Sequence, residues 1–496
     1  MRADCIGGSS INVNRAYTDS VSNSAPSKGG AEVKNDSSAA SSTPVDAFQS
    51  SDLTVDNDGN VRFILSFSKD AKASDTAAFL EAQKKNGSTV SDKLPLINGC
   101  SVDVKLEDVD NMLKNLPVGT QIAVDRPLIF DNPTLMKSAQ PGAVPEEGKA
   151  TADIADALIG IDEVWDMGYT GKGQTIAIID SGIYPHPDLE GKITGWVDMQ
   201  DGALKPMDTY GHGTHVAGIA AGNGTKSAGV HKGVAPDANV VGVRISNVSE
   251  AIKGIQWVIE NKDRLGIGVI NMSLGDFAMR SYKDDPWAQA AEKAMEAGLV
   301  VCVAAGNDGP SERNISTPGI HPDVITVGAL DDNGTLDRSD DKVADFSSRG
   351  PTNIDGINKP DLIAPGVNIY GPLAPGAGID DDSLPHIGQD YVAISGTSMA
   401  TPMVAGVAAC LKQANPNLTH KDVKEILVKS CDNYLDEPKY VQGAGLINAK
   451  KALELALTWD TSHDIEALAK DTPKAESASQ VEAKDAAPSD EGFLMA

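Results

Sequence analysis

The sequence is poor in aromatic residues, in cysteine and in long apolar runs, and each shortage excludes a class of protein. Aromatic residues make up 4% of the 496 residues, whereas 48 residues are glycine. This balance favours an α/β protein with many tight turns over an all-β sandwich. No run of 18 apolar residues occurs, so we expect no transmembrane helix.

Cysteine is too sparse and too scattered to form a disulfide scaffold. The five cysteines include no Cys-x-x-Cys pair, and Cys302 lies in the apolar run 299–303, where we expect a buried free thiol. This usage is typical of a reducing compartment. Because the first residues also lack the apolar core of a secretory signal, we expect a cytoplasmic protein. A start further upstream would instead allow secretion.

Positive charge is also scarce. Lys and Arg number 42 against 70 Asp and Glu, which gives a net charge of −28. Phosphate binding requires a basic surface, so nucleic acid is excluded as a partner. The acidic residues chiefly indicate a well-solvated surface, and a weaker alternative is that their field attracts basic peptides.

Composition divides the chain into five segments. Residues 1–55 are rich in Ser and lack apolar periodicity, which predicts a flexible arm. Residues 56–130 and 151–457 alternate strand-like and helix-like patterns, and the Pro/Gly-rich residues 131–150 form a linker between them. The acidic, Ala-rich residues 458–496 are expected to form a flexible or loosely helical tail.

The two patterned segments predict two domains of different class. The first has expected strands at 61–67, 99–104 and 121–124, and expected helices from 75 and at 106–116. A further strand near 94–97 would complete a small α+β unit of the β-α-β-β-α-β type. The second predicts an α/β domain with a doubly wound, mostly parallel sheet. Its expected strands are 175–179, 240–245, 269–271, 300–304 and 324–327, and its expected helices are 212–221, 248–261, 287–297 and 398–414.

Three polar residues of the second domain are candidates for catalysis. Asp180 ends a buried strand, at the edge where ligands of open α/β sheets gather. His212 lies between glycines that let the backbone approach closely, and Ser398 begins a helix whose N–H groups favour a developing anion. Asp180 alone could be a turn residue, and Ser398 alone an N-cap. Together the three follow the order Asp, His, Ser, one of the known orders of a serine-protease triad.

Three further residues, Asn307, His215 and His186, have contexts that suggest a role. Asn307 follows a buried strand at a glycine turn, where its side chain is suited to donate to the same anion; in isolation it would be a left-handed turn residue. His215 lies three residues after His212, but His-x-x-His without glutamate or a third ligand is not a zinc-protease pattern. We expect His215 to be structural and His186 to be a loop residue. The chemistry then requires no metal or other cofactor.

Three segments resemble the signature blocks of the subtilases. They are Ile-Ile-Asp-Ser-Gly at 178–182, Gly-His-Gly-Thr-His-Val-Ala-Gly at 211–218 and Gly-Thr-Ser-Met-Ala at 396–400. Asn-Met-Ser-Leu-Gly at 271–275 and Ala-Ala-Gly-Asn at 304–307 match as well. The resemblance implies a subtilisin-like fold, in which Asp180, His212 and Ser398 form the triad and Asn307 donates to the oxyanion.

The same resemblance implies the residues that bind substrate. Ser273, Leu274 and Gly275 would pair with the substrate backbone. The pocket for the residue before the cleaved bond would have Ser316 as its floor and, as its wall, Ala304, Ala305 and Gly306. Such small residues imply a roomy, mostly apolar pocket, and Asp308 near its mouth would tolerate basic side chains. The bond between Thr317 and Pro318 would be cis.

The chain is also similar to subtilases outside the catalytic blocks. Residues 56–130 resemble the subtilase propeptide, an intramolecular chaperone and inhibitor, so the chain would be a zymogen that cuts itself within 131–150. The segments Phe-Ser-Ser-Arg-Gly-Pro at 346–351 and Lys-Pro-Asp-Leu-Ile-Ala-Pro-Gly at 359–366 are similar to AprX-like bacterial subtilases. Those subtilases lack a conventional secretion signal.

The chain departs from the family pattern at several places. The loop after Ile245 is shorter than in many subtilisins, which reduces the edge that binds substrate residues further from the cleaved bond. Met403 replaces a usual histidine, and we expect only a packing change. Residues 222–229 lack the strong calcium-loop pattern. Structural calcium could bind the acidic loops 331–333 and 380–382, although solvated turns are favoured.

The sequence therefore predicts a serine endopeptidase that acts on proteins or peptides through an acyl-enzyme. An esterase of the α/β-hydrolase type would require Gly-x-Ser-x-Gly and the order Ser, Asp, His, and neither occurs around Ser398. A catalytically silent binding protein or chaperone would typically lack a member of the triad, whereas all three are present.

Overall fold

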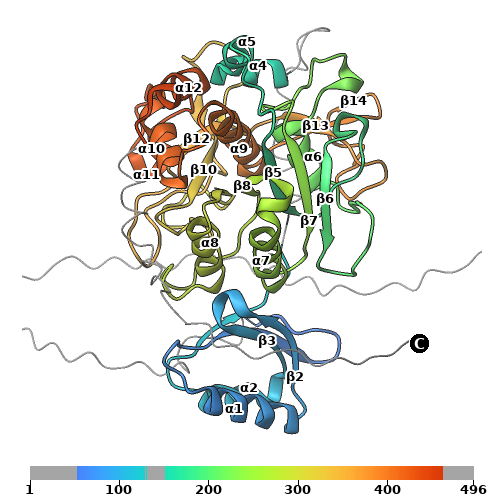
Figure 1. Cartoon of the computed structure of the whole chain (residues 1–496), viewed down its shortest axis with the longest axis vertical. Coiled ribbons are helices and arrows are strands. Elements are labelled where there is room, and N and C mark those ends of the chain that lie inside the picture. Colours follow the sequence, from blue (N-terminus) through green and yellow to red (C-terminus); the bar gives the residue numbers. More distant parts are fainter. Residues whose placement is uncertain (1–52, 129, 131–150, 462–496) are drawn as a thin grey trace, which may run out of the picture. The chain divides into compact units, whose positions relative to one another are not determined.

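The computed structural model describes residues 53–128, 130 and 151–461 (Figure 1). Nearly all of the predicted arm and tail, and the linker, lie outside the described residues. The described part contains a small α+β region before the linker and a larger α/β region after it.

The α+β region is a four-stranded antiparallel sheet with two helices. The chain order is β-α-β-β-α-β, as predicted, and the strands lie in the order β2-β3-β1-β4. Alternate residues of β1, including Val61, Phe63 and Leu65, are fully buried in one apolar core. The elements are β1 (Asn60–Ser66), α1 (Ala73–Lys85), β2 (Thr89–Leu94), β3 (Gly99–Lys105), α2 (Val109–Lys114) and β4 (Gln121–Val124).

The expected strand near 94–97 was misplaced, because β2 ends at Leu94. Residues Pro95–Ile97 form a 3-10 turn that Pro95 begins and that Asn98 ends in the left-handed conformation, with φ 50°. Proline has no N–H to donate to a sheet. β2 is an edge strand in which only Leu94 is buried, so it has no alternation of apolar residues for a sequence pattern to detect.

The α/β region is built on an eight-stranded, mostly parallel sheet (Figure 1), which confirms the predicted fold class. The order is β11-β10-β9-β8-β5-β7-β6, and β12 pairs with β10. Only the short β11 is antiparallel to its neighbour. The strands are β5 (Thr175–Asp180), β6 (Ile193–Asp198), β7 (Asn239–Arg244), β8 (Ile267–Met272), β9 (Val300–Ala304), β10 (Ile325–Asp331), β11 (Lys342–Val343) and β12 (Leu362–Pro365).

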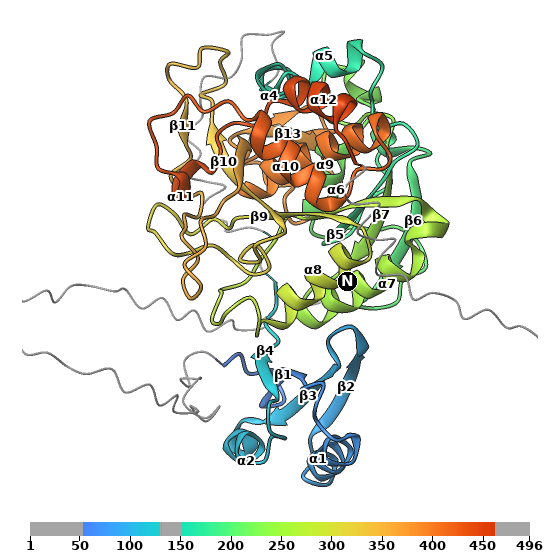
Figure 2. The same ribbon diagram turned by 60° about the vertical axis from the view of Figure 1, so that its left-hand side comes forward.

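Helices cover both faces of this sheet (Figure 2). Helices α6 (His212–Ala221) and α9 (Thr397–Ala414) contribute to one apolar core, and α7 (Val248–Leu265) and α8 (Pro286–Glu296) contribute to the other. The central strand β5 supplies both cores, with Ile176 and Ile178 on one face and Ala177 and Ile179 on the other. A strand buried on both faces reads as a continuous apolar run, which is why β5 could be recognised in the sequence.

The remaining elements flank the large sheet. A small antiparallel sheet lies just before α9 in the chain and consists of β13 (Ile369–Pro372), β14 (His386–Ile387) and β15 (Tyr391–Ile394). The further helices are α4 (Thr151–Ile159), α5 (Ile161–Asp166), α10 (His420–Ser430), α11 (Lys439–Gln442) and α12 (Ala449–Thr458). Packing continues past residue 457, because the Trp459 indole N–H donates to Asp422 Oδ1 at 2.8 Å.

Within the described ranges, none of the helices combines the length and hydropathy that a bilayer crossing requires. Cys302 is a free thiol and is fully buried, as predicted. Burial raises the pKa of this thiol, so it stays protonated. The cytoplasmic location stays a prediction.

Candidate active site

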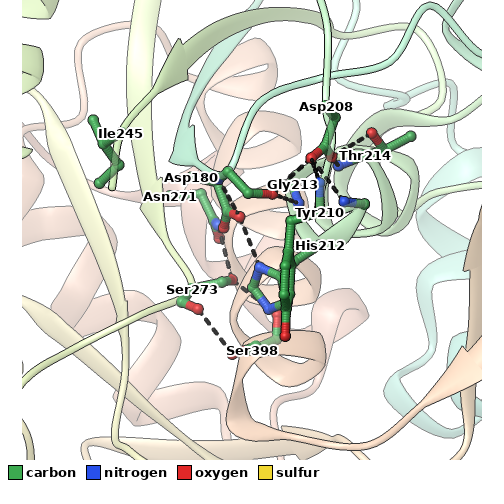
Figure 3. Close-up of polar contacts among 12 residues, drawn as sticks. Asp180, Asp208, Tyr210, His212, Gly213, Thr214, Ile245, Asn271, Ser273 and Ser398 are labelled. Atoms are coloured by element: carbon green, nitrogen blue, oxygen red, sulfur yellow. Dashed lines mark hydrogen bonds and ion pairs between the residues drawn. The ribbon is translucent and has the colours of Figure 1, made fainter. Parts of the chain in front are cut away.

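Asp180 and His212 form a buried hydrogen-bonded pair (Figure 3). Asp180 is the last residue of β5, and its Oδ1 lies 2.7 Å from His212 Nδ1. The Ser181 N–H also donates to Asp180 Oδ1, at 2.7 Å. A carboxylate in this position holds the imidazole with its proton on Nδ1, so that Nε2 is the nitrogen that can act as a base.

His212 begins α6, and the turn before it is organised by Asp208 (Figure 3). Asp208 Oδ1 accepts from the Gly211 and Tyr210 N–H groups at 2.7 and 3.1 Å. Its Oδ2 accepts from Thr214 N–H and Oγ1 at 2.9 and 2.6 Å. Our sequence analysis missed Asp208, although an aspartate shortly before a glycine turn is a recognisable turn signal.

Close packing at Gly213 brings α6 to the end of β5. A Cβ at this position would lie 2.1 Å from the Gly182 carbonyl oxygen and 3.0 Å from Asp180 Cβ. Any side chain there would push the helix away from the strand. The glycine after His212 is therefore required by the distance between the two catalytic candidates.

Ser398 is the second residue of α9 and is almost fully buried. Its Oγ donates to the Ser273 carbonyl at 2.8 Å, and Ser273 Oγ donates back to the Ser398 carbonyl at 2.8 Å (Figure 3). Asn271, which belongs to the matching segment 271–275 but was given no role from the sequence, donates from Nδ2 to Ser273 Oγ at 3.0 Å. If Ser398 is the nucleophile, its hydroxyl hydrogen would have to leave the Ser273 carbonyl before it could pass to His212.

Asn307 is fixed beside the N-terminus of α9. Its Oδ1 accepts from both the N–H and the Oγ1 hydroxyl of Thr397, at 2.9 Å each. Because the amide oxygen is occupied, the Nδ2 donors project to the opposite side, next to Gly396. Thr397 was not identified from the sequence as an orienting residue.

Residues that the family resemblance assigns to substrate binding lie together. A Cβ on Gly275 would lie 2.6 Å from Ser316 Cβ, and one on Gly306 would lie 2.3 Å from Ser316 Oγ. Ser348, which the sequence analysis missed, also contacts this point, because its Oγ would lie 2.8 Å from a Cβ on Gly306. Its hydroxyl accepts from the Asp308 N–H at 3.1 Å.

Two further details of this region are settled. Thr317 and Pro318 are joined by a cis bond, as predicted. Burial raises the pKa of the Asp308 carboxyl. A neighbouring cationic side chain would favour its ionised form.

His215 and His186 are held by the surrounding structure, as predicted. His215 is fully buried, its Nε2 lies 3.0 Å from the Val392 carbonyl, and burial lowers its pKa to about 3. His186 Nδ1 accepts from the Asp188 N–H at 3.1 Å. Among the residues that the structure describes, no three His, Cys, Asp or Glu side chains are grouped to hold a metal ion.

The acidic loops considered for calcium form hydrogen-bonded turns. Asp331 Oδ1 accepts from the Asn333 N–H at 3.2 Å, and Asp381 Oδ1 accepts from the Ser383 N–H at 2.8 Å. Asp332 is nearly buried, and burial raises its pKa to about 7.

The shortened loop after Ile245 still offers an edge for an extended chain. It leads directly into α7, whose N-cap Asn247 accepts from the Glu250 N–H at 2.9 Å. Asn247 is bridged antiparallel to Pro127, and the Leu128 N–H donates to the Ser246 carbonyl at 2.8 Å. A chain segment from the α+β region therefore occupies this edge.

The same segment reaches the candidate catalytic residues. The Phe130 ring centroid lies 5.9 Å from that of His212 and 5.7 Å from that of Tyr210. The chain thus runs from the edge at the start of α7 towards the Asp180–His212 pair.

Comparisons with known proteins agree with this architecture. A family model described as the subtilase family matches residues 171–445. Serine protease AprX of Bacillus subtilis is 41% identical over 385 residues, which are 75% of this chain and 82% of that protein. M-protease of Shouchella clausii is 31% identical over 422 residues, or 82% of this chain and 95% of that protein.

A solved structure extends the agreement to three dimensions. The keratinolytic enzyme fervidolysin of Fervidobacterium pennivorans, related to subtilisin, superposes with a TM-score of 0.62 at 25% identity. The match covers 82% of this chain and 62% of fervidolysin. The chain therefore belongs to the subtilase family and is a subtilisin-like serine protease.

Proposed function

We propose that the protein cleaves peptide bonds through an acyl-enzyme, with Asp180, His212 and Ser398 as its triad. The observation that carries this assignment is the buried 2.7 Å contact between Asp180 Oδ1 and His212 Nδ1. It couples a carboxylate to the imidazole whose Nε2 would act as the base. Ser398 supplies the nucleophile from the first turn of α9.

The reaction takes place in two halves. Ser398 Oγ leaves the Ser273 carbonyl and attacks the scissile carbonyl, while His212 Nε2 takes its proton. Asp180 stabilises the resulting imidazolium, which then protonates the leaving amine. Water attacks the acyl-enzyme in the second half, again with His212 as the base, and Ser398 is regenerated.

Asn307 and the Ser398 N–H are the proposed donors to the oxyanion. Two bonds from Thr397 hold the Asn307 amide before substrate arrives, so no reorganisation is needed when charge develops. The N-terminal end of α9, a helix of 18 residues, adds a partial positive charge at the same place.

The substrate is a protein or peptide bound in an extended conformation. Ser273, Leu274 and Gly275 would pair with its backbone, and Ser316 would close the pocket for the residue before the cleaved bond. The pocket wall is Ala304, Ala305 and Gly306. These small residues favour apolar side chains, and the Asp308 carboxyl would accept basic ones.

The protein is proposed to be a self-processing zymogen. Residues 56–130 would act as an inhibitor, and cleavage within 131–150 would release them. This proposal is supported by Leu128 and Phe130, since one pairs with the edge at Ser246 and the other contacts the His212 ring. An occupied edge of this kind would compete with substrate.

The test uses the full chain with Ser398→Ala and a matched control. The control is Ser430→Ala, which removes a buried serine hydroxyl that donates to the Leu427 carbonyl of its own helix. A fluorophosphonate probe should label the unmodified chain and Ser430→Ala but not Ser398→Ala. Mass spectrometry should find cleavage within 131–150 only in the first two. Processing of pure Ser398→Ala at the unmodified rate would rule out self-cleavage by Ser398.

A further inference from the structure

An ion pair lies beside the edge that Pro127 and Leu128 occupy. Arg126 Nη1 lies 3.3 Å from Asp276 Oδ2, and the two side chains are 21% and 18% exposed. Arg126 precedes Phe130, which contacts the His212 ring, by four residues. Pro127 and Leu128 pair with the edge at Asn247 and Ser246. In such an extended segment alternate side chains share a face, so Arg126 belongs to the same face as Leu128.

Asp276 is held rigidly, and it directly follows Gly275. Its N–H donates to the Thr317 carbonyl at 3.0 Å, and its carbonyl accepts from the Thr317 N–H at 2.9 Å. Its Oδ1 accepts from the Phe277 N–H at 2.8 Å. The backbone and one carboxylate oxygen are thus fixed, and the other oxygen faces Arg126.

The recess around this pair suits a long basic side chain. Apolar side chains of Val248, Phe277, Met279 and Trp287 line it. Phe277 and Met279 are 64% and 48% exposed, unusually so for large apolar residues. The methylene stem of an arginine or lysine can cover such surface while its charged end reaches a carboxylate.

A second cation in the recess has its own counter-charges. Burial lowers the pKa of Arg280; the charges of Asp285 and Asp284 oppose this change, and that of Arg126 adds to it. Asp285 also accepts from the Trp287 and Ala288 N–H groups. Asp276 is the carboxylate of this recess whose Oδ2 lies 3.3 Å from Arg126 of the occupying chain.

We propose that Asp276 is a specificity-determining residue, which selects polypeptides with an arginine or lysine upstream of the cleaved bond. The selected position is four residues before the residue whose side chain contacts the His212 ring. Residues 125–128 hold the place of such a substrate, with Arg126 in the selecting position. This inference rests on the proposed catalytic role of His212 and Ser398.

The test compares internally quenched peptides with the sequence of residues 122–140. One carries arginine at the position of Arg126, and its partner carries citrulline, which has nearly the same shape without the charge. Both are given to the matured, unmodified protease, and mass spectrometry establishes that the same bond is cut. Asp276→Asn is assayed beside Asp263→Asn, which removes an equal charge from an exposed side chain on α7.

The arginine peptide should have a kcat/KM about fivefold to tenfold above the citrulline peptide, as a partly buried pair with a charged hydrogen bond allows. The ratio should fall towards one in 1 M NaCl, because salt screens the pair, and in Asp276→Asn but not in Asp263→Asn. Equal values for the two peptides with the unmodified protease would overturn the proposal, whether or not Asp276→Asn folds.

Failure of the catalytic assignment would look different. A protein that cleaves neither peptide, hydrolyses no casein and resists the fluorophosphonate probe would contradict the role of Ser398. A protein that hydrolyses casein but not the arginine peptide would contradict only the proposed selection by Asp276. That peptide contains the chain's own sequence around Arg126, which the proposal expects to be preferred.

Discussion

The side-chain oxygen of Asn307 accepts hydrogen bonds from both the N–H and the hydroxyl of Thr397, at 2.9 Å each. An amide whose oxygen is doubly bound has a defined orientation, and its NH₂ group is then directed away from Thr397. In the proposed mechanism Asn307 donates to the oxyanion, and Thr397 positions its side chain.

The first prediction separates these two roles. Asn307→Ala removes the donor and should lower kcat by about 10²–10³-fold, as for the equivalent donor of subtilisin, with little change in KM. Thr397→Val removes only the hydroxyl and retains the N–H bond, so its loss in kcat should stay below about tenfold. Steady-state kinetics on one peptide substrate measure both. A larger effect on KM than on kcat in Asn307→Ala would argue for ground-state binding instead.

The second prediction concerns the imidazole tautomer. In Asp180→Asn, the side-chain amide can donate to His212 Nδ1, which places the proton on Nε2 and removes the base. The kcat should fall by about 10⁴-fold, the loss known for such a change in a serine-protease triad. Affinity for a noncovalent peptide inhibitor should hardly change, which serves as the control for folding. A loss of less than tenfold would mean that Asp180 does not orient the base.

Much of this arrangement could be predicted from local sequence. The bounds of α6 and β9 were predicted to the residue, because their apolar residues and flanking glycines mark both ends. Asp180, at the end of a continuous apolar strand, and His212, between glycines, could be placed on the same grounds. We expected the two residues to meet because active-site residues of a parallel sheet gather at the carboxyl ends of its strands.

The rest depends on contacts between distant parts of the chain. No local pattern pairs Pro127 with Asn247, or directs the Ser398 hydroxyl to the Ser273 carbonyl. The edge strand β2 was misplaced because its inner face carries Asp92 between Val90 and Leu94, so it shows no clear apolar period. Periodicity reports burial along one element, whereas these contacts depend on tertiary packing.

The third prediction concerns Asp125, a carboxylate only 6% exposed that accepts from the Ser249 N–H of α7 at 2.9 Å. Burial raises the pKa of Asp125 from 3.8 to about 6. The bonds to Ser249 and the charge of Arg62 oppose this rise, and the charge of Glu250 adds to it. A carboxyl whose pKa is higher in the folded protein than in the unfolded one makes its full contribution to stability below pH 3.8. That contribution is lost as the pH rises to about 6 and stays absent above it.

The measurement compares Asp125→Asn with the unmodified residue, both in a Ser398→Ala background that prevents cleavage. The free energy of unfolding of Asp125→Asn relative to the parent should rise by about 1–3 kcal/mol between pH 4 and pH 6.5 and then level off. Denaturant titrations at several pH values give the difference. A difference independent of pH would mean that Asp125 is not perturbed by burial.

The last prediction concerns Asp188, a fully buried carboxylate that accepts hydrogen bonds from two other segments of the chain. Its Oδ2 accepts from the Tyr391 hydroxyl at 2.6 Å, and its Oδ1 accepts from the Lys226 N–H at 2.8 Å. Lys226 lies in the segment 222–229 that departs from the calcium-loop pattern. Tyr391→Phe leaves one carboxylate oxygen in a buried site without its donor, and such a loss costs about 1–3 kcal/mol of stability.

Thermal and urea unfolding of Tyr391→Phe should report that loss. The control is Tyr370→Phe, which removes a phenol hydroxyl from the neighbouring strand of the same small sheet and should cost less. Because β15 leads into α9, the Tyr391→Phe variant should also lose part of its kcat as Ser398 becomes less firmly placed. Unchanged stability in Tyr391→Phe would mean that other donors satisfy Asp188, and the contact between Asp188 and Tyr391 would then have no energetic role.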